Sequence, residues 1–123
     1  SLAFLVANIL YINQFPDIRA DRVAHKYTVI VRLGLLRARW GYLALLLAGY
    51  GWLALMVLGQ HLPLSALLAL MPMAFSLLAF TELWRNAHQP AQLSKAIRLT
   101  ILAALLHGVI LSLVLLVSHN GAR

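Results

Sequence analysis

The 123-residue chain has no cysteine and carries only three acidic side chains against ten lysines and arginines. Without cysteine it can form no disulfide, thiolate nucleophile or cysteine-ligated metal site. Charged residues are also scarce, at 11% of the chain, whereas hydrophobic residues make up 63%. A water-soluble domain of this size could not bury so much apolar surface. We therefore expect the chain to have lipid as its solvent.

Three apolar runs are long enough to cross a membrane as helices, namely residues 40–59, 62–84 and 99–118. A span takes about 20 mostly apolar residues in a helix, because a helix satisfies its own backbone polar groups in hydrocarbon. Residues 1–14 form a fourth apolar stretch, which is too short to cross alone and resembles the middle of a span. The sequence thus predicts an all-α, multi-span transmembrane helix bundle with three full spans and a truncated N-terminal helix.

The basic residues divide unevenly between the two ends of these spans. If each run crosses once, one side holds every base except Arg123, and this side includes the loop of residues 15–39. By the positive-inside rule this loop is cytoplasmic and the C-terminus lies outside, in the cell inner membrane if the protein is bacterial. The net charge of +7 is then explained by contact with a lipid bilayer, without a nucleic-acid partner. The bases on the loop side are Arg19, Arg22, Lys26, Arg32, Arg37, Arg39, Arg85, Lys95 and Arg98.

Glycine and proline mark a turn and a break in the apolar segments. Gly59 suits the end of a helix and Pro63 the start of the next, so residues 59–63 are expected to form a tight turn between antiparallel neighbours. Pro72 falls inside the second span and is expected to kink it, because proline removes a backbone hydrogen bond.

Side chains on the helix surfaces carry further expectations. Ala44, Ala48 and Gly51 line up as small residues that permit close helix contact. Glu82 and Arg85 are three residues apart and are expected to pair at a helix end. Aromatic residues near the predicted interfaces are expected to anchor the helices in the membrane surface. They are Tyr27, Trp40, Tyr42 and Trp84.

Two of the three acids, Asp17 and Asp21, lie four residues apart in the loop. On a helix that begins near Pro16 they share one face, with Cβ atoms ~6 Å apart. Neither has a base three or four residues away, and Arg19 and Arg22 fall on the opposite face, where we expect them to face lipid. A solvated helix whose acids are neutralised by nearby bases is the simpler interpretation. An unneutralised pair would instead need a cation, and Mg²⁺ with a diphosphate substrate meets that need.

The residues around this pair resemble the second aspartate-rich motif of the UbiA superfamily of membrane prenyltransferases. The most similar branch includes 1,4-dihydroxy-2-naphthoate polyprenyltransferase, and the last span, from Ile97 to Gly108, is also similar to that branch. Motif-level similarity covers residues 11–34. Its defining positions are Asn13, Asp17, Asp21, Lys26, Thr28 and the run Val31-Arg32-Leu33-Gly34.

The resemblance implies that residues 1–123 are the C-terminal part of a single domain of nine membrane helices. Such a domain transfers an isoprenyl group from a prenyl diphosphate to an aromatic acceptor, here in menaquinone-like quinone biosynthesis. Mg²⁺ is held by two Asp-rich loops, of which this chain supplies the second. Asp17 and Asp21 would be the catalytic metal ligands and Asn13 would bind substrate. The side chains implied for the diphosphate are Lys26, Arg32 and Arg22.

Two histidines are further candidates for the site. The family usually has Gly immediately before the motif lysine, and His25 stands there in this chain. A turn that needs positive φ tolerates His poorly, so His25 is either an exposed loop residue or an added ligand or proton acceptor. His107 lies within the last span, where an ionisable residue is costly unless it faces the bundle. A structural hydrogen bond and a substrate contact both remain open for it.

Two other interpretations compete with aromatic prenylation. The same diphosphate chemistry would serve a different acceptor, such as hydroxybenzoate or haem. A small non-catalytic membrane protein, for example a scaffold or transporter subunit, could use the Asp pair to bind a cation or partner. The presence of a further Asp-rich loop and about five more spans before Ser1 would favour the enzyme.

The isolated chain is predicted to be inactive, because the resemblance places half of the metal ligands on a loop that it lacks. Expression of residues 1–123 in a membrane, followed by an assay of Mg²⁺-dependent prenyl transfer, checks this expectation. Robust transfer by the chain alone would show that the two-loop site is the wrong description.

Overall fold

A computed structural model describes residues 1–121 of the chain, so Arg123, the lone base expected outside, lies beyond the described residues. Every regular element is helical in this part of the chain. In order they are α1 (Leu2–Asn13), α2 (Ile18–Val23), α3 (Val29–Leu33), α4 (Leu35–Leu58), η1 (Leu64–Leu70), α5 (Met73–Asn86), η2 (Pro90–Gln92) and α6 (Ser94–Gly121).

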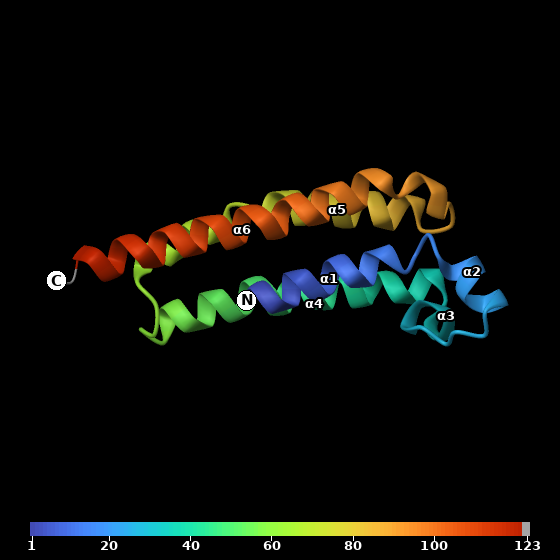
Figure 1. The fold of residues 1–123 in the computed structure, drawn as a ribbon, viewed down its shortest axis with the longest axis horizontal. Helices are drawn as coiled ribbons and strands as arrows, with labels where there is room; N and C mark the ends of the chain where they lie inside the picture. The colour runs from blue at the N-terminus through green and yellow to red at the C-terminus, as the bar shows by residue number, and fades with distance from the viewer. Residues whose placement is uncertain (122–123) are drawn as a thin grey trace.

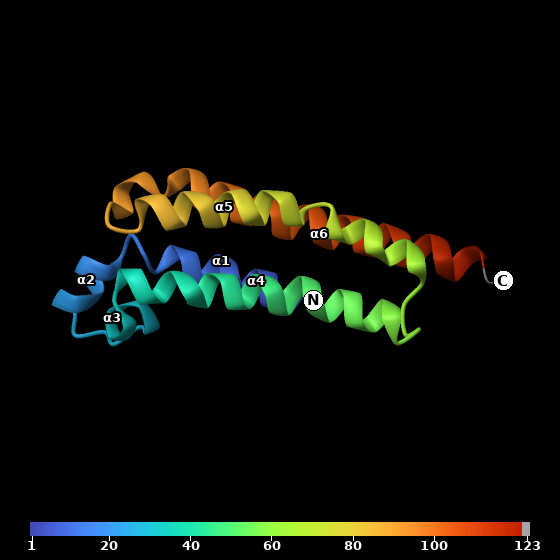
Figure 2. The same cartoon turned by 180° about the vertical axis from the view of Figure 1, so that it is seen from behind.

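The long helices form an elongated bundle with two layers (Figures 1 and 2). One layer contains α1 and α4, and the other contains α6 beside the segment formed by η1 and α5. α1 packs against both α4 and α6, so it joins the two layers. α4 contacts η1 and α5 after a tight turn, which confirms that the second and third predicted helices are antiparallel neighbours.

Three segments are long and apolar enough to cross a membrane, namely Leu35–Leu58, Leu64–Asn86 and Ser94–Asn120. They confirm the predicted all-α bundle with three spans and a shorter apolar helix at the N-terminus. Each extends past the predicted apolar run at the end that carries the bases, and α4 starts at Leu35 rather than Trp40. Bases at its start can remain helical because long basic side chains reach the polar interface.

The predicted break at Pro72 is confirmed, since η1 ends at Leu70 and α5 begins at Met73. The break leaves the Ala69 carbonyl available, and the His107 ring of α6 meets it with Nδ1 at 2.7 Å. A carbonyl only accepts hydrogen bonds, so Nδ1 carries the proton and Nε2 accepts from the Ser1 hydroxyl at 2.9 Å. His107 is fully buried, and its hydrogen bond to the Ala69 carbonyl stabilises the proline break.

Hydroxyl groups make further contacts between helices. The Tyr42 hydroxyl lies 2.8 Å from Thr100 Oγ1, which donates its own proton to the Ala96 carbonyl at 2.8 Å. Tyr42 is thus the donor of the pair and links α4 to α6. It is completely buried, so the expectation that it anchors the membrane surface is wrong. Its ring stacks on Phe80, with centroids 6.2 Å apart.

α4 makes its close helix contacts at Gly41 and Gly49, which are not members of the predicted stripe of small residues. A Cβ at Gly49 would lie 3.0 Å from Leu5 Cδ2, and one at Gly41 would overlap the Tyr11 hydroxyl. Gly51, from the predicted stripe, has nothing within 4 Å of such a Cβ, and Ala44 is exposed. The predicted stripe therefore makes no close helix contact at Ala44 or Gly51 within residues 1–121.

Gly41→Ala is expected to destabilise the bundle by roughly 1–3 kcal/mol, because its methyl group would displace the Tyr11 ring. That ring's hydroxyl donates to the Ala38 carbonyl at 2.7 Å, and this bond would be lost as well. The measurement is thermal unfolding in detergent micelles. Gly51→Ala on the same helix is the matched control and should leave the melting temperature unchanged or slightly raised. Equal effects of the two substitutions would contradict this packing.

Candidate functional site

The short elements α2, α3 and η2 gather at one end of the bundle, which we call the basic end (Figure 1). The nine bases predicted on the loop side all belong to the segments that meet here. Four buried side chains attach the loops to the long helices, and the core cluster includes them. They are Phe15, Ile18, Ile30 and Leu93. The loop that bears the Asp pair is thus a packed part of the fold.

The two aspartates lie one helical turn apart on α2. Asp17 is the N-cap residue, and the Asp21 backbone N–H donates to the Asp17 carbonyl at 2.8 Å. This spacing places both side chains on the same side of the helix. Asp17 is exposed and Asp21 is half-buried. Because Phe15 and Ile18 are buried on either side of Pro16 and Asp17, the chain presents the Asp17 carboxylate outward.

Neither carboxylate is neutralised by a base of the described chain. Within residues 1–121 the one salt bridge joins Lys95 Nζ to Glu82 Oε1 at 2.6 Å. The expected pair of Glu82 with Arg85 is therefore replaced by a pair across the α5–α6 connection. The Asp17 side chain also makes no capping hydrogen bond to α2. The carboxylate oxygens of both residues are therefore not engaged by a salt bridge within the described chain, and such oxygens are suitable ligands for a hard cation.

His25 occupies a backbone position that suits glycine. The Lys26 N–H donates to the Asp21 carbonyl at 2.8 Å and the His25 N–H to the Arg22 carbonyl at 3.2 Å. This is the Schellman pattern at a helix C-terminus, in which the residue after the cap takes positive φ. His25 has φ 52° and its side chain is exposed. The turn thus has the geometry that glycine adopts most easily, and His25 adopts it at a cost in strain.

The same pattern ends α4. The His61 N–H donates to the Met56 carbonyl at 2.9 Å and the Gln60 N–H to the Val57 carbonyl at 3.0 Å. Gly59 is the C-cap, as the sequence predicts, but the residue with positive φ is Gln60, at 58°.

The other predicted site residues do not all lie near the Asp pair. The basic side chains implied for a diphosphate are all exposed at the basic end, and they are Arg22, Lys26 and Arg32. Asn13 is exposed at the end of α1, where its Nδ2 donates to the Ile9 carbonyl at 2.8 Å. His107 lies roughly 20 Å along α6 from Ser94, so the structure does not bring it to the Asp pair.

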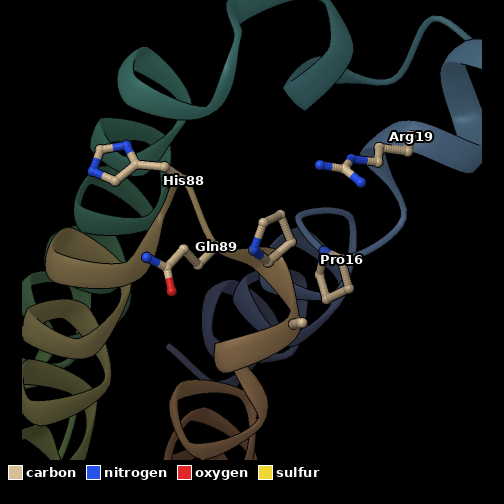
Figure 3. A pocket seen from close by; sticks show the side chains of 6 residues that line it. Pro16, Arg19, His88 and Gln89 are labelled. Carbon is tan, nitrogen blue, oxygen red and sulfur yellow. The ribbon is translucent and has the colours of Figure 1, made fainter.

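A groove of about 390 Å³ separates the Asp loop from the α5–α6 connection (Figure 3). Arg19 extends its guanidinium into the space between the two segments, with Pro16 below it (Figure 3). Arg19 therefore faces this groove, whereas its position opposite the acids had predicted contact with lipid. The lining residues are Pro16, Arg19, His88, Gln89, Pro90 and Ala91. Sequence spacing gave no signal for His88 and Gln89, because they meet the Asp loop only through the fold.

Two buried polar atoms near the Asp loop have no hydrogen-bond partner in the described chain, namely Gln14 Oε1 and Thr28 Oγ1. Thr28 is the N-cap of α3, but its side chain does not cap the helix. Gln14 was not singled out by its sequence position. Buried polar groups normally have partners, so these two atoms can serve a ligand or water.

The donor set at the basic end fits Mg²⁺ in part. Among residues 1–121 no cluster of three or more His, Cys, Asp or Glu side chains could enclose a metal ion. Asp17 and Asp21 offer two carboxylates, and Mg²⁺ commonly takes one or two carboxylates together with waters and substrate phosphates. These two carboxylates alone do not complete the coordination shell of Mg²⁺. A phosphate substrate or a second loop would have to supply further ligands.

No protein-family model, curated protein or solved structure matches this chain.

His25→Gly is expected to stabilise the protein by about 1 kcal/mol, because glycine adopts positive φ without the steric strain of a Cβ. Thermal unfolding and amide hydrogen exchange of Lys26 in micelles measure the effect. Ala24→Gly is the matched control: Ala24 has φ −80°, so glycine there relieves no strain and should slightly destabilise. Lower stability in His25→Gly would indicate that the imidazole makes a contact worth more than the strain.

Proposed function

We propose that this protein is a Mg²⁺-dependent membrane prenyltransferase, and that the basic end is its diphosphate site. The observation that carries the proposal is the Asp17–Asp21 pair, which lies at the end of a membrane bundle without a basic partner in the described chain. Two carboxylates one helical turn apart supply the hard oxygen ligands that Mg²⁺ takes together with substrate phosphates. The motif resemblance over residues 11–34 supports the same conclusion.

The chemistry proposed is transfer of an isoprenyl group to carbon. The C–O bond of the prenyl diphosphate breaks, the diphosphate leaves with the electron pair, and the acceptor carbon forms the new bond and loses a proton. Mg²⁺ bound at the carboxylates would stabilise the charge that develops on the leaving diphosphate. Asp17 and Asp21 would hold the metal, and Asn13 would contribute an amide near the substrate.

The exposed bases have the complementary role. These bases lie on consecutive segments: Arg22 on α2, Lys26 on the turn after it and Arg32 on α3. Each is exposed and forms no salt bridge in the described residues. Their charges can neutralise phosphate oxygens. The apolar helices below them keep water from the isoprenyl group as its allylic bond breaks.

We infer that the basic end faces the cytoplasm, following the positive-inside rule, and that the other end of α6 faces outward. The acceptor is proposed to be an aromatic ring of a menaquinone-like pathway, which rests on similarity to the dihydroxynaphthoate branch. A bacterial protein of this kind would lie in the inner membrane.

Asp17→Asn and Asp21→Asn are each expected to lower prenyl transfer at least 100-fold, because each removes a charged metal ligand at a site of developing charge. The measurement is Mg²⁺-dependent transfer of a labelled prenyl diphosphate to dihydroxynaphthoate, in membranes that contain the protein expressed from its complete gene. Glu82→Gln is the matched control, since Glu82 is the only other acid of the chain and pairs with Lys95.

Activity that survives both Asp substitutions, at normal expression and folding, would return the pair to a solvated surface helix. If Glu82→Gln lost as much activity as the Asp variants, the loss would be due to the change in net charge at the basic end and not to a missing metal ligand. If the protein transferred the prenyl group to hydroxybenzoate or haem and not to dihydroxynaphthoate, the proposed site would stand and the proposed acceptor would be wrong. Absence of transfer to every acceptor by the unmodified protein would favour the scaffold or transporter alternative.

A further inference from the structure

A second groove lies on the membrane-facing surface between α4 and α5, close to the basic end. Its volume is about 520 Å³, within the range of about 300–1,000 Å³ that small-ligand sites occupy. The groove is lined by Trp40, Leu43, Phe80, Thr81, Trp84 and Arg85. Because Trp40 belongs to the start of α4 and Trp84 to the end of α5, the mouth of the groove lies where the spans reach the interface.

Aromatic rings form the walls of this groove in a defined arrangement. Trp40 meets Trp84 edge to face, with ring centroids 5.1 Å apart, and Phe80 lies 5.5 Å from Trp84. Arg39 fixes the Trp84 ring from another side, with its guanidinium carbon 3.5 Å from the ring centroid. Arg39 Nη1 also donates to the Trp84 carbonyl at 3.2 Å. The walls are therefore held in place before any ligand binds.

Arg85 brings a positive charge to the mouth of the groove and forms no salt bridge in the described chain. Arg85 is exposed and would pair with Glu82 by spacing alone, but the Glu82 carboxylate is engaged by Lys95 at 2.6 Å. Arg39 lies against another side of Trp84 and does not line the groove, so Arg85 is the base at its mouth. The groove thus has mostly apolar walls and one cationic side chain, Arg85, at its mouth.

We propose that this groove binds an anionic phospholipid. One acyl chain lies along Leu43 and Phe80, and the phosphate meets the Arg85 guanidinium at the mouth. Charge complementarity selects this occupant over a neutral lipid, because a base near the membrane surface attracts anionic lipid with about 1 kcal/mol. Tryptophan rings at the interface suit the boundary between acyl chain and headgroup. The proposal does not depend on prenyl transfer and uses none of the residues assigned to it.

Tryptophan fluorescence in the presence of brominated lipids tests the proposal directly. The chain is reconstituted in phosphatidylcholine vesicles with a minor share of either brominated phosphatidylglycerol or brominated phosphatidylcholine. The Trp52→Phe variant reports only the two groove tryptophans, Trp40 and Trp84. Its fluorescence should reveal about a fivefold preference for the brominated anionic lipid over the neutral one. Trp52 is exposed elsewhere on α4, so the Trp40→Phe/Trp84→Phe variant should show no such preference.

Arg85→Gln in the Trp52→Phe background should abolish the preference, and Arg85→Lys should retain most of it. Arg98→Gln removes an exposed base of α6 that does not line the groove and should leave the preference intact. Circular dichroism establishes that each variant is folded. Equal quenching by the two lipids, a preference that persists in Arg85→Gln, or an equal loss in Arg98→Gln would each overturn the proposal.

Discussion

Polar groups inside a lipid bilayer have no water to bond with, and most of this structure follows from that constraint. The long helices satisfy their own backbone, and the exception at Pro72 is covered by a side chain from another helix. His107 donates to the Ala69 carbonyl at 2.7 Å, next to the break. Tyr42 reaches Thr100 in the same way, at 2.8 Å. Both polar side chains are therefore parts of the packing between helices, which explains why they are buried within apolar spans.

The same constraint moves charge and candidate chemistry to the basic end. Water and headgroups are available there, so the connecting segments and the adjoining helix ends can carry nine bases and two aspartates. Buried anchors such as Phe15 and Ile30 hold these segments on the bundle. The result is a charged surface with a defined shape, in which Asp17 and Asp21 occupy one side of α2. Two separate grooves open beside it, one near Arg19 and one between α4 and α5.

The candidate site was predictable from the sequence to the extent that it is local. The four-residue spacing of the aspartates, the lack of a base at helical distance and the unusual residue at position 25 all concern neighbours along the chain. The partner of Glu82 could not be predicted in this way, because Lys95 comes from the next helix. Likewise Arg19 faces a groove that exists only because the turn at His88 packs near α2.

The sequence alone determined that the chain has three membrane spans, a break at Pro72 and one strongly basic end. These properties depend on hydropathy, proline geometry and charge position, which act over a few residues at a time. Tertiary structure decided which small residues of α4 meet another helix, namely Gly41 and Gly49, and which residues accept positive φ. It also decided which base is left free at the aromatic groove. Such features depend on which helices lie side by side, and a pattern within one helix carries no information about the surface of its neighbour.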